Sequence, residues 1–239
     1  MLNTHISHQI YAKLSFDATN NQKKIIEKLS EWLAGEAFER IFLLNGYAGT
    51  GKTTILAALV SALKVLGIKP ILLAPTGRAA KVLARYSGEA AYTIHKKIYR
   101  QKSFADESAS FSICDNLNKH TLFLVDEASM ISNEGLSGSI FGSGRLLDDL
   151  IQYVYSGEGC RLLILGDTAQ LPPVGEEQSP ALSAMMLAGY GLEVMEANLT
   201  QVVRQAESSG ILWNATALRK LLVQDECYSL PKIRITGFP

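Results

Sequence analysis

The sequence predicts an α/β fold in which a mostly parallel sheet is covered by helices on both faces. Segments with strand character alternate with segments of helical periodicity along most of the 239 residues. Several strand segments are continuously apolar, as expected of strands buried on both faces: residues 41–44, 71–74, 121–125 and 161–165. A glycine-rich loop at residues 46–53 separates the first of these strands from a helix. These observations predict that ligands bind at the carboxyl ends of the strands.

The first third of the chain contains two predicted helices around the first strand. Residues 1–18 lack strong periodicity, and residues 10–14 are compatible with a short edge strand. Thr19 or Asn20 can cap a following helix, which Gly35 is expected to end. After strand 41–45 and the glycine-rich loop, a helix is predicted over 52–66, closed by Gly67.

The rest of the chain continues the alternation, with one insertion. The expected elements are a turn at 75–77, helices at 78–86, 93–100, 145–155, 179–188 and 209–223, and strands at 71–74, 121–125, 161–165 and 192–197. Residues 101–118 mix serines with aromatic side chains and are interpreted as a small hairpin insertion rather than as part of the core. Four glycines within 132–144 indicate a mobile loop.

The composition indicates one α/β domain with a substantial core. Hydrophobic residues make up 47% of the sequence, and no apolar run approaches the length needed to span a membrane. The N-terminus lacks a signal-peptide pattern. The three cysteines are far apart and suggest neither a disulfide framework nor a zinc site. A reduced, cytoplasmic setting and no membrane partner are therefore expected.

Charge is balanced overall but uneven along the chain. The formal net charge is zero, which by itself argues against a nucleic-acid binder. Residues 78–102, however, contain seven basic residues and one acid, whereas residues 126–196 contain eleven acids and two bases. Such a distribution can give a local cationic surface, although a solvated helix face is the simpler interpretation of the basic run alone.

The loop at residues 46–53 reads Gly46-Tyr47-Ala48-Gly49-Thr50-Gly51-Lys52-Thr53 and fits the phosphate-loop pattern at every specified position. Its glycines allow backbone N–H groups to curl around a polyphosphate, and the loop opens onto a helix N-terminus that favours an anion. Lys52 is placed to reach the β- and γ-phosphates of ATP, and the hydroxyl of Thr53 is placed for Mg²⁺. The predicted nucleotide-binding residues here are Gly46, Ala48, Gly49, Thr50, Gly51, Lys52, Thr53 and Thr54.

Two further strand ends carry polar side chains. Asp126 and Glu127 directly follow strand 121–125. Beside a phosphate loop, Asp126 can hold Mg²⁺ and Glu127 can orient and deprotonate an attacking water, which favours hydrolysis over transfer. Gln170 follows strand 161–165 and can hydrogen-bond both a γ-phosphate and a nearby water. Read alone, residues 166–174 would be only a proline-stiffened loop.

The motifs together resemble the first motor domain of superfamily 1 helicases, in the 5′-to-3′ branch typified by the alpha subunit of exodeoxyribonuclease V (RecD-like). The resemblance spans residues 16–210, with the matching segments in family order: Asn21-Gln22, 46–54, 73–80, Thr93-Ile94-His95, 125–130, 166–173 and 199–205. It implies a RecA-like P-loop NTPase fold, an ATP hydrolase and helicase activity, and a role in DNA repair or recombination. Residues 101–118 fall where relatives carry a small inserted hairpin, which can act as a strand-separating pin. Phe104 or Phe111 would then lie at its tip, or would be packed locally.

The resemblance also implies roles for individual residues. Gln22 would recognise the edge of the adenine base, and Gln170 would couple the state of the bound nucleotide to the strength of DNA binding. Arg204 would be an arginine finger on the γ-phosphate, so the implied catalytic residues are Lys52, Glu127, Gln170 and Arg204. Without the other motifs, Gln22 would be read as an exposed helix residue and Arg204 as a surface salt-bridge partner.

A single-stranded DNA surface is implied as well. Pro75, Thr76, Thr93 and His95 would face the strand, because hydroxyls, helix N-termini and cationic side chains contact phosphates irrespective of sequence. Arg78 and Lys81, one helical turn apart, would add positive charge.

The resemblance implies a partner that the sequence does not supply. Motors of this superfamily hold ATP between two RecA-like domains, and the residues after Gln205 are too few for a second one. A single motor domain over 1–239 is therefore expected, as a piece of a longer protein that binds nucleotide weakly and does not unwind DNA alone. Two other readings remain open at this point: a P-loop ATPase that remodels RNA or protein, and an inactive nucleotide- or DNA-binding module.

Overall fold

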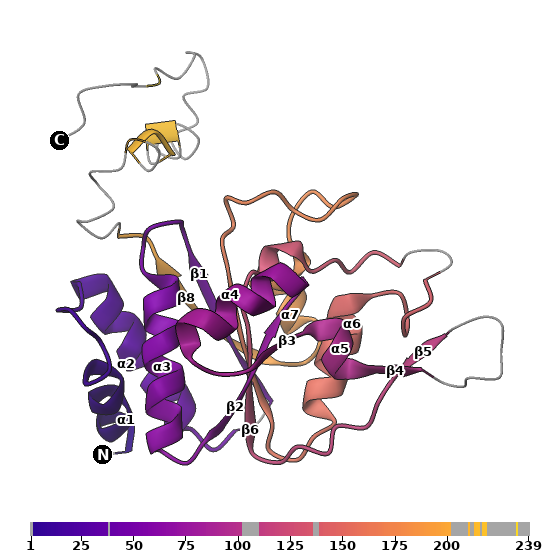
Figure 1. The fold of residues 1–239 in the computed structure, drawn as a ribbon, viewed down its shortest axis with the longest axis horizontal. Helices are drawn as coiled ribbons and strands as arrows, with labels where there is room; N and C mark the ends of the chain where they lie inside the picture. The colour runs from indigo at the N-terminus through magenta and orange to yellow at the C-terminus, as the bar shows by residue number, and fades with distance from the viewer. Residues whose placement is uncertain are drawn as a thin grey trace.

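The computed structural model describes residues 2–37, 39–101, 110–135 and 139–201, together with 210, 213–215, 217–218 and 233 (Figure 1). Its centre is a six-stranded sheet in which every pairing is parallel. The strand order is β3-β2-β6-β7-β1-β8. The bounds are β1 Arg40–Gly46, β2 Lys69–Ala74, β3 Ala91–Thr93, β6 Thr121–Val125, β7 Arg161–Gly166 and β8 Glu193–Leu199. The predicted parallel α/β fold is confirmed.

Helices cover both faces of the sheet, as the continuously apolar strands require. Alternate residues of one strand point to opposite faces, so that Phe42 and Leu44 belong to one buried cluster and Ile41 and Leu43 to the other. The first cluster lies under α1 Leu2–Tyr11, α2 Asn20–Ala34, α3 Lys52–Val65 and α4 Gly77–Ser87. The second lies under α5 Ile94–Ile98, α6 Leu146–Tyr155, α7 Ala184–Ala188 and the 3₁₀ turns η1 Ala128–Met130 and η2 Pro180–Leu182.

The N-terminal segment is a helix, so the expected edge strand at 10–14 is wrong. Helix α1 spans Leu2–Tyr11 and packs on α2 and α3. Its buried side chains are Ile6 and Ile10, which are four residues apart and therefore share one helical face. Two apolar anchors in a polar stretch are too few to reveal this periodicity, and the packing against α2 and α3 decides the conformation.

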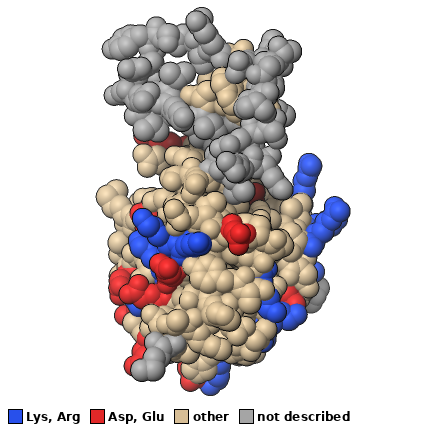
Figure 2. Space-filling model, turned by 90° about the vertical axis from the view of Figure 1, so that its left-hand side faces the viewer, with Lys and Arg blue, Asp and Glu red and all other residues tan. Residues whose placement is uncertain are grey.

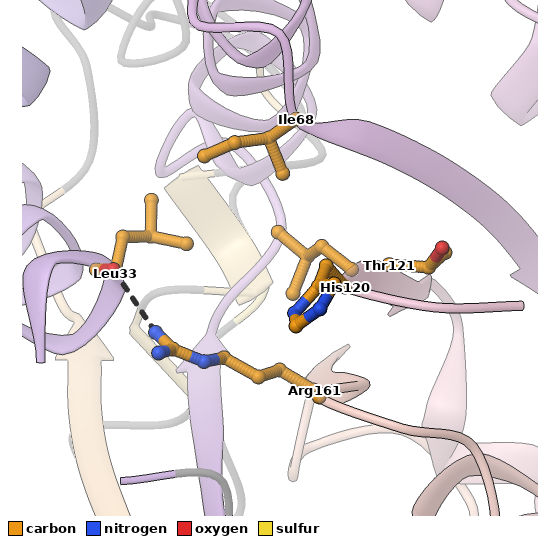
Figure 3. A pocket seen from close by; sticks show the side chains of 7 residues that line it. Leu33, Ile68, His120, Thr121 and Arg161 are labelled. Carbon is orange, nitrogen blue, oxygen red and sulfur yellow. Dashed lines mark hydrogen bonds between the residues drawn. The ribbon is translucent and has the colours of Figure 1, made fainter. Parts of the chain in front are cut away.

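Both ends of α2 are capped by identifiable contacts. At the start, Thr19 and Gln22 form a reciprocal capping box, as the predicted capping position allows. At the end, the Arg161 guanidinium donates to the carbonyl oxygens of Trp32 at 3.0 Å and Leu33 at 2.9 Å, and also to that of Gly35. Figure 3 shows this contact at the wall of a small cavity of about 160 Å³, beside the first residues of β6 and β7.

The predicted hairpin exists but begins earlier than expected. Helix α5 ends at Ile98 rather than at Arg100, because β4 Tyr99–Gln101 pairs antiparallel with β5 Phe111–Ile113. Phe111 begins β5 and pairs with Gln101, and its ring stacks on Phe141 with centroids 4.7 Å apart, which is the local packing that the sequence left open. Phe104 lies outside the described residues.

The glycine-rich segment expected to be a mobile loop makes specific contacts where it is described. Phe111 N donates to Ile140 O at 2.7 Å, and Gly142 N donates to Phe111 O at 2.8 Å, so residues 140–142 extend the hairpin. Upstream, the carboxylate of Glu176 accepts from Ser132 Oγ and from the N–H groups of Asn133 and Glu134. The loop is thus tied to the hairpin and to the segment after β7.

Two C-terminal predictions need adjustment. The expected helix at 179–188 is divided into η2 and α7, because Ser183 is extended and caps α7. The expected strand 192–197 is confirmed as β8, which runs to Leu199. Most of the predicted 209–223 helix lies outside the described residues. None of the helices in the described ranges is long and apolar enough to cross a membrane.

Candidate functional site

The phosphate loop connects β1 to α3 at the carboxyl edge of the sheet, as predicted. Gly49 and Gly51 have φ angles of 79° and 90°, the left-handed region that glycine adopts without a Cβ penalty. Gly46 is needed for a different reason, since a Cβ there would lie 2.8 Å from the Cβ of Leu199 and 2.9 Å from Lys52 Cγ. The loop therefore holds an open cradle of backbone next to the N-terminus of α3.

Lys52 lies within this cradle and is largely shielded from solvent. Its ammonium group donates to the carbonyl of Gly46 and lies 3.8 Å from the Oδ2 of Asp167, which is almost completely buried after β7. Asp167 was not predicted as a site residue, although its motif was recognised. The buried carboxylate holds the lysine ammonium at the loop, where a polyphosphate would supply further negative charge.

The carboxylate of Asp126 follows β6 and is held by two donors. Its Oδ1 accepts from the N–H of Glu127 at 2.9 Å, and its Oδ2 accepts from the hydroxyl of Tyr86. Thr53 is exposed at the start of α3. The described residues include no group of three or more His, Cys, Asp or Glu able to hold a metal ion alone. A hydroxyl and a carboxylate fit Mg²⁺, which keeps waters and takes its other ligands from substrate phosphates.

Glu127 and Gln170 meet, although 43 positions separate them. Gln170 Nε2 donates to Glu127 Oε2 at 3.2 Å, while Gln170 Oε1 accepts from Ser129 Oγ at 2.9 Å. Glu127 itself has a φ of 55°, an uncommon value for a residue with a Cβ. The carboxamide of Gln170 therefore orients the Glu127 carboxylate, and Ser129 orients the carboxamide in turn. The sequence does not predict Ser129 as a site residue, because its role depends on a hydrogen bond to Gln170 that only the fold brings about.

Gln22 is buried beneath the phosphate loop, so the alternative reading of an exposed helix residue is wrong. Its Oε1 accepts from Thr19 N at 3.0 Å, and its Nε2 donates to the carbonyl of Thr50 at 3.2 Å. Gln22 thus links the start of α2 to the loop. Its neighbour Asn21 joins α2 to the end of β8, donating to Asn198 O at 3.1 Å and accepting from Thr200 N at 3.1 Å.

A cavity of about 830 Å³ lies over the loop. Most of its lining comes from predicted site residues and their neighbours: Tyr47, Ala48, Gly49, Gly51, Lys52, Thr53, Thr54, Glu127, Asp167 and Gln170. The segment before α2 adds Ser15, Phe16 and Asp17, which the sequence did not single out. The volume and the polar lining fit a nucleotide.

The residues expected to face DNA gather at the ends of two adjacent strands. Ala74 pairs with Thr93 across β2 and β3, so Thr76 and Thr93 lie at the same corner of the sheet. Thr76 Oγ1 caps α4 by accepting from Ala79 N, and Thr93 Oγ1 caps α5 by accepting from Lys96 N. Pro75 is partly buried between these strand ends.

Exposed basic side chains accompany this corner. Arg78, Lys81 and Arg85 are exposed on α4. His95 packs against Tyr99 and Phe141, with ring centroids 5.6 and 5.0 Å away, and burial lowers the pKa of its imidazole. A lowered pKa makes His95 neutral near pH 7, so it can donate one hydrogen bond or stack there but supplies no charge. On the side shown in Figure 2, basic and acidic residues of the described chain lie next to one another.

Arg204, the expected arginine finger, lies outside the described residues.

The carboxyl ends of β1, β6 and β7 carry the phosphate loop, the Asp126-Glu127 pair and the Asp167-to-Gln170 segment, respectively. These three strands are adjacent in the sheet.

The chain matches the AAA domain family over residues 19–225. That match covers well over half of the sequence and includes the phosphate loop and the strand-end residues described above. The chain belongs to this family.

Two curated DNA helicases are similar in sequence. The ATP-dependent RecD2 DNA helicase of Deinococcus radiodurans is 32% identical over 198 residues, which are 82% of this chain and 24% of that protein. The ATP-dependent DNA helicase dda of Enterobacteria phage T4 is 30% identical over 141 residues, 58% of this chain and 29% of that protein. The chain thus spans roughly a quarter of the length of these relatives.

The fold is also that of a solved helicase. The structure of a Pif1 helicase from Bacteroides, in complex with ADP-AlF₃ and single-stranded DNA, superposes with a TM-score of 0.50 at 21% identity. The match covers 89% of this chain and 48% of that one. The expected resemblance to the motor region of superfamily 1 helicases is confirmed: the chain has a P-loop NTPase fold, is similar in sequence to the RecD2 and Dda helicases, and shares its fold with a Pif1 helicase.

Proposed function

We propose that this chain is the first, ATP-binding motor domain of a DNA helicase that couples ATP hydrolysis to 5′-to-3′ movement along single-stranded DNA. The observation that carries the proposal is that two groups of side chains share one edge of one sheet. Lys52, Glu127 and Gln170 line one cavity, and Thr76 and Thr93 lie at strand ends on the β2–β3 side of the same sheet. A motor domain can couple ATP hydrolysis to movement along DNA only if its ATP site and its DNA-binding surface belong to one rigid unit.

In this proposal each side chain of the cavity has one task in hydrolysis. The N–H groups of residues 46–53 and Lys52 bind the phosphates, and Thr53 and Asp126 hold Mg²⁺, which neutralises phosphate charge. Glu127, oriented by Gln170, accepts the proton of the attacking water. The adenine edge is assigned to Gln22, whose carboxamide would have to leave Thr50 O to reach it.

The strand-binding task falls to the corner formed by β2 and β3. The N-termini of α4 and α5 and the exposed Arg78 and Lys81 favour phosphate groups without reading base sequence. Pro75, Thr76, Thr93 and His95 complete this surface. Because Thr76 and Thr93 oxygens accept capping bonds, their hydroxyl hydrogens remain available to donate to a phosphate.

Catalysis by this site is proposed to require a second RecA-like domain that closes over the cavity. The segment after Gln170 supports such a partner, since Leu171 is 89% exposed and Val174 fully exposed there. Large apolar side chains that are exposed together commonly mark a contact surface. Arg204 is assigned to the same closed state, as a second cation on the γ-phosphate.

The deciding experiment measures binding of a fluorescent ATP analogue with Mg²⁺ to the 239-residue chain. Lys52→Ala should weaken binding by about tenfold or more, because a charge-assisted contact to phosphate is worth ~1.5–3 kcal/mol. Lys64→Ala, also on α3, is the matched control, since its exposed ion pair with Glu89 contributes little. Undiminished binding by Lys52→Ala would refute the site assignment.

The identity of the polymer along which the motor moves is tested in a natural protein that carries this chain together with a second motor domain. Hydrolysis of ATP should be stimulated by single-stranded DNA and, in a tailed-duplex assay, unwinding should require a 5′ tail. Stimulation by RNA or by a protein, but not by DNA, would favour the alternative of a remodelling ATPase.

A further inference from the structure

Tyr86 makes a contact that the proposed chemistry does not yet use. It lies in the last turn of α4, and its hydroxyl donates a hydrogen bond to Asp126 Oδ2 across a sequence separation of 40 residues. Asp126 is the carboxylate assigned to Mg²⁺. Of the neighbouring pair, Glu127 lines the cavity, while Asp126 is turned toward Tyr86.

The surroundings of Tyr86 hold its hydroxyl in place as a donor. The ring is partly buried and packs on the apolar cluster beneath α1–α4, which limits its rotation. A phenol hydroxyl can donate one hydrogen bond, and the ionised carboxylate of Asp126 can only accept, so Tyr86 is the donor of this contact.

Asp126 is held from both sides by these contacts. Its Oδ1 accepts from Glu127 N at 2.9 Å, its Oδ2 accepts from Tyr86, and its own N–H donates to Leu73 O at 3.0 Å. A carboxylate offers about four lone-pair positions, so two accepted bonds fix its orientation and leave positions for a metal or a metal-bound water. Carboxylates that bind metals are commonly oriented by such outer contacts.

The same helix reaches the proposed DNA surface. Thr76 caps the start of α4, and Arg78 and Lys81 are exposed along it, while Tyr86 contacts Asp126 from its last turn. One helix of 11 residues thus joins the surface assigned to the strand and the carboxylate assigned to the metal.

We propose that Tyr86 is a positioning residue for Asp126, and that its hydrogen bond connects the Mg²⁺ carboxylate to the helix that faces single-stranded DNA. The inference rests on the proposed function, which supplies the role of Asp126. Tyr86 is not among the residues that line the nucleotide cavity; it acts through the orientation of the carboxylate.

The test measures how strongly Mg²⁺ tightens nucleotide binding. Tyr86→Phe keeps the ring and its packing but removes the donor. In the 239-residue chain, titration of Mg²⁺ at constant ADP should give an apparent Mg²⁺ affinity about tenfold weaker than in the wild type, with ADP binding in EDTA unchanged. Tyr92→Phe is the control, because it removes the hydroxyl of an exposed tyrosine on β3. The centroid of the Tyr92 ring lies 5.9 Å from Lys96 Nζ.

A double-mutant cycle separates positioning from general damage. Asp126→Asn should abolish most of the Mg²⁺ dependence, and adding Tyr86→Phe to it should have no further effect, because both changes act through one carboxylate. Additive losses would overturn the inference. Should Tyr86→Phe fail to fold by circular dichroism, Tyr86→Met, which also lacks a donor, takes its place in the cycle.

The outcomes distinguish this inference from the function on which it rests. If the wild type binds Mg²⁺-ADP and Tyr86→Phe matches Tyr92→Phe, the role of Tyr86 is refuted and the nucleotide site stands. Tighter Mg²⁺ binding by Tyr86→Phe would also refute it, since the hydroxyl would then compete with the metal. If the wild type binds no nucleotide, both proposals fail.

Discussion

Glu127 combines several unusual features for a single residue. It has a left-handed backbone, it receives a hydrogen bond from Gln170, and its N–H orients the neighbouring Asp126. Non-glycine residues in this backbone region cost about 1–3 kcal/mol and persist where the surroundings enforce them, commonly at functional sites. The turn directs the Glu127 carboxylate into the cavity, while the Asp126 carboxylate remains beside α4.

Replacing Glu127 by Gln separates binding from hydrolysis. The carboxamide keeps the shape and an oxygen that can accept from Gln170 Nε2, but it cannot take a proton. We expect nucleotide affinity within about twofold of wild type and a loss of about 10²-fold or more in DNA-stimulated hydrolysis in a protein carrying both motor domains. The control is Glu177→Gln, an exposed residue of the nearby loop. Near-normal turnover would refute the assignment of Glu127 as the base.

Among the elements, α2 connects the stability of the fold most directly to the nucleotide site. Thr19 and Gln22 close its first turn, and the same Gln22 side chain donates to Thr50 in the phosphate loop. At its other end, Arg161 reaches the final carbonyl groups from the start of β7, as Figure 3 shows for Leu33. Gln22, which takes part in the cap of α2, therefore also stabilises the phosphate loop.

The loss of this cap is predicted to affect both properties. Thr19→Ala removes the oxygen that accepts from Gln22 N and should lower the free energy of unfolding by about 1 kcal/mol in urea titrations. Because Gln22 loses part of its anchoring, nucleotide binding should weaken as well. Thr4→Ala, at an exposed position in the first turn of α1, is the control. Equal stability of the two variants would contradict a stabilising role for the capping box.

At the scale of the whole molecule, two apolar clusters share the residues of one sheet. Successive positions of β1 belong to opposite clusters, because the two layers of helices cover opposite faces of the same strands. Loss of either layer would therefore expose one apolar face of the whole sheet. The nucleotide cavity lies over the carboxyl ends of the central strands. Binding there should therefore stabilise both layers together.

Thermal unfolding of the 239-residue chain should consequently show one cooperative transition for the sheet and both layers. Mg²⁺-ADP at 100 times its dissociation constant should add ~2.7 kcal/mol of stability and raise the midpoint, because only the folded state binds. Lys52→Ala should unfold in one transition with a much smaller shift. Two separate transitions in scanning calorimetry, only one of them moved by nucleotide, would show that the layers are independent.

The sequence determined the contiguous features: the apolar strands, the phosphate loop and the acidic pair after β6. Each depends on neighbours within a few positions, so local pattern suffices to predict it. Sequence reasoning failed at α1, where only Ile6 and Ile10 mark the buried face, and it left two places open for Phe111, whose packing depends on Phe141. Local patterns carry no information about such distant partners.

Only the tertiary structure decided which distant side chains meet. The strand order brings β6 and β7 side by side, which places Gln170 against Glu127, and it brings Lys52 after β1 within reach of Asp167. The path of α4 across the sheet carries Tyr86 to Asp126. These contacts follow from the packing of strands and helices into layers, a long-range property that motif spacing does not encode.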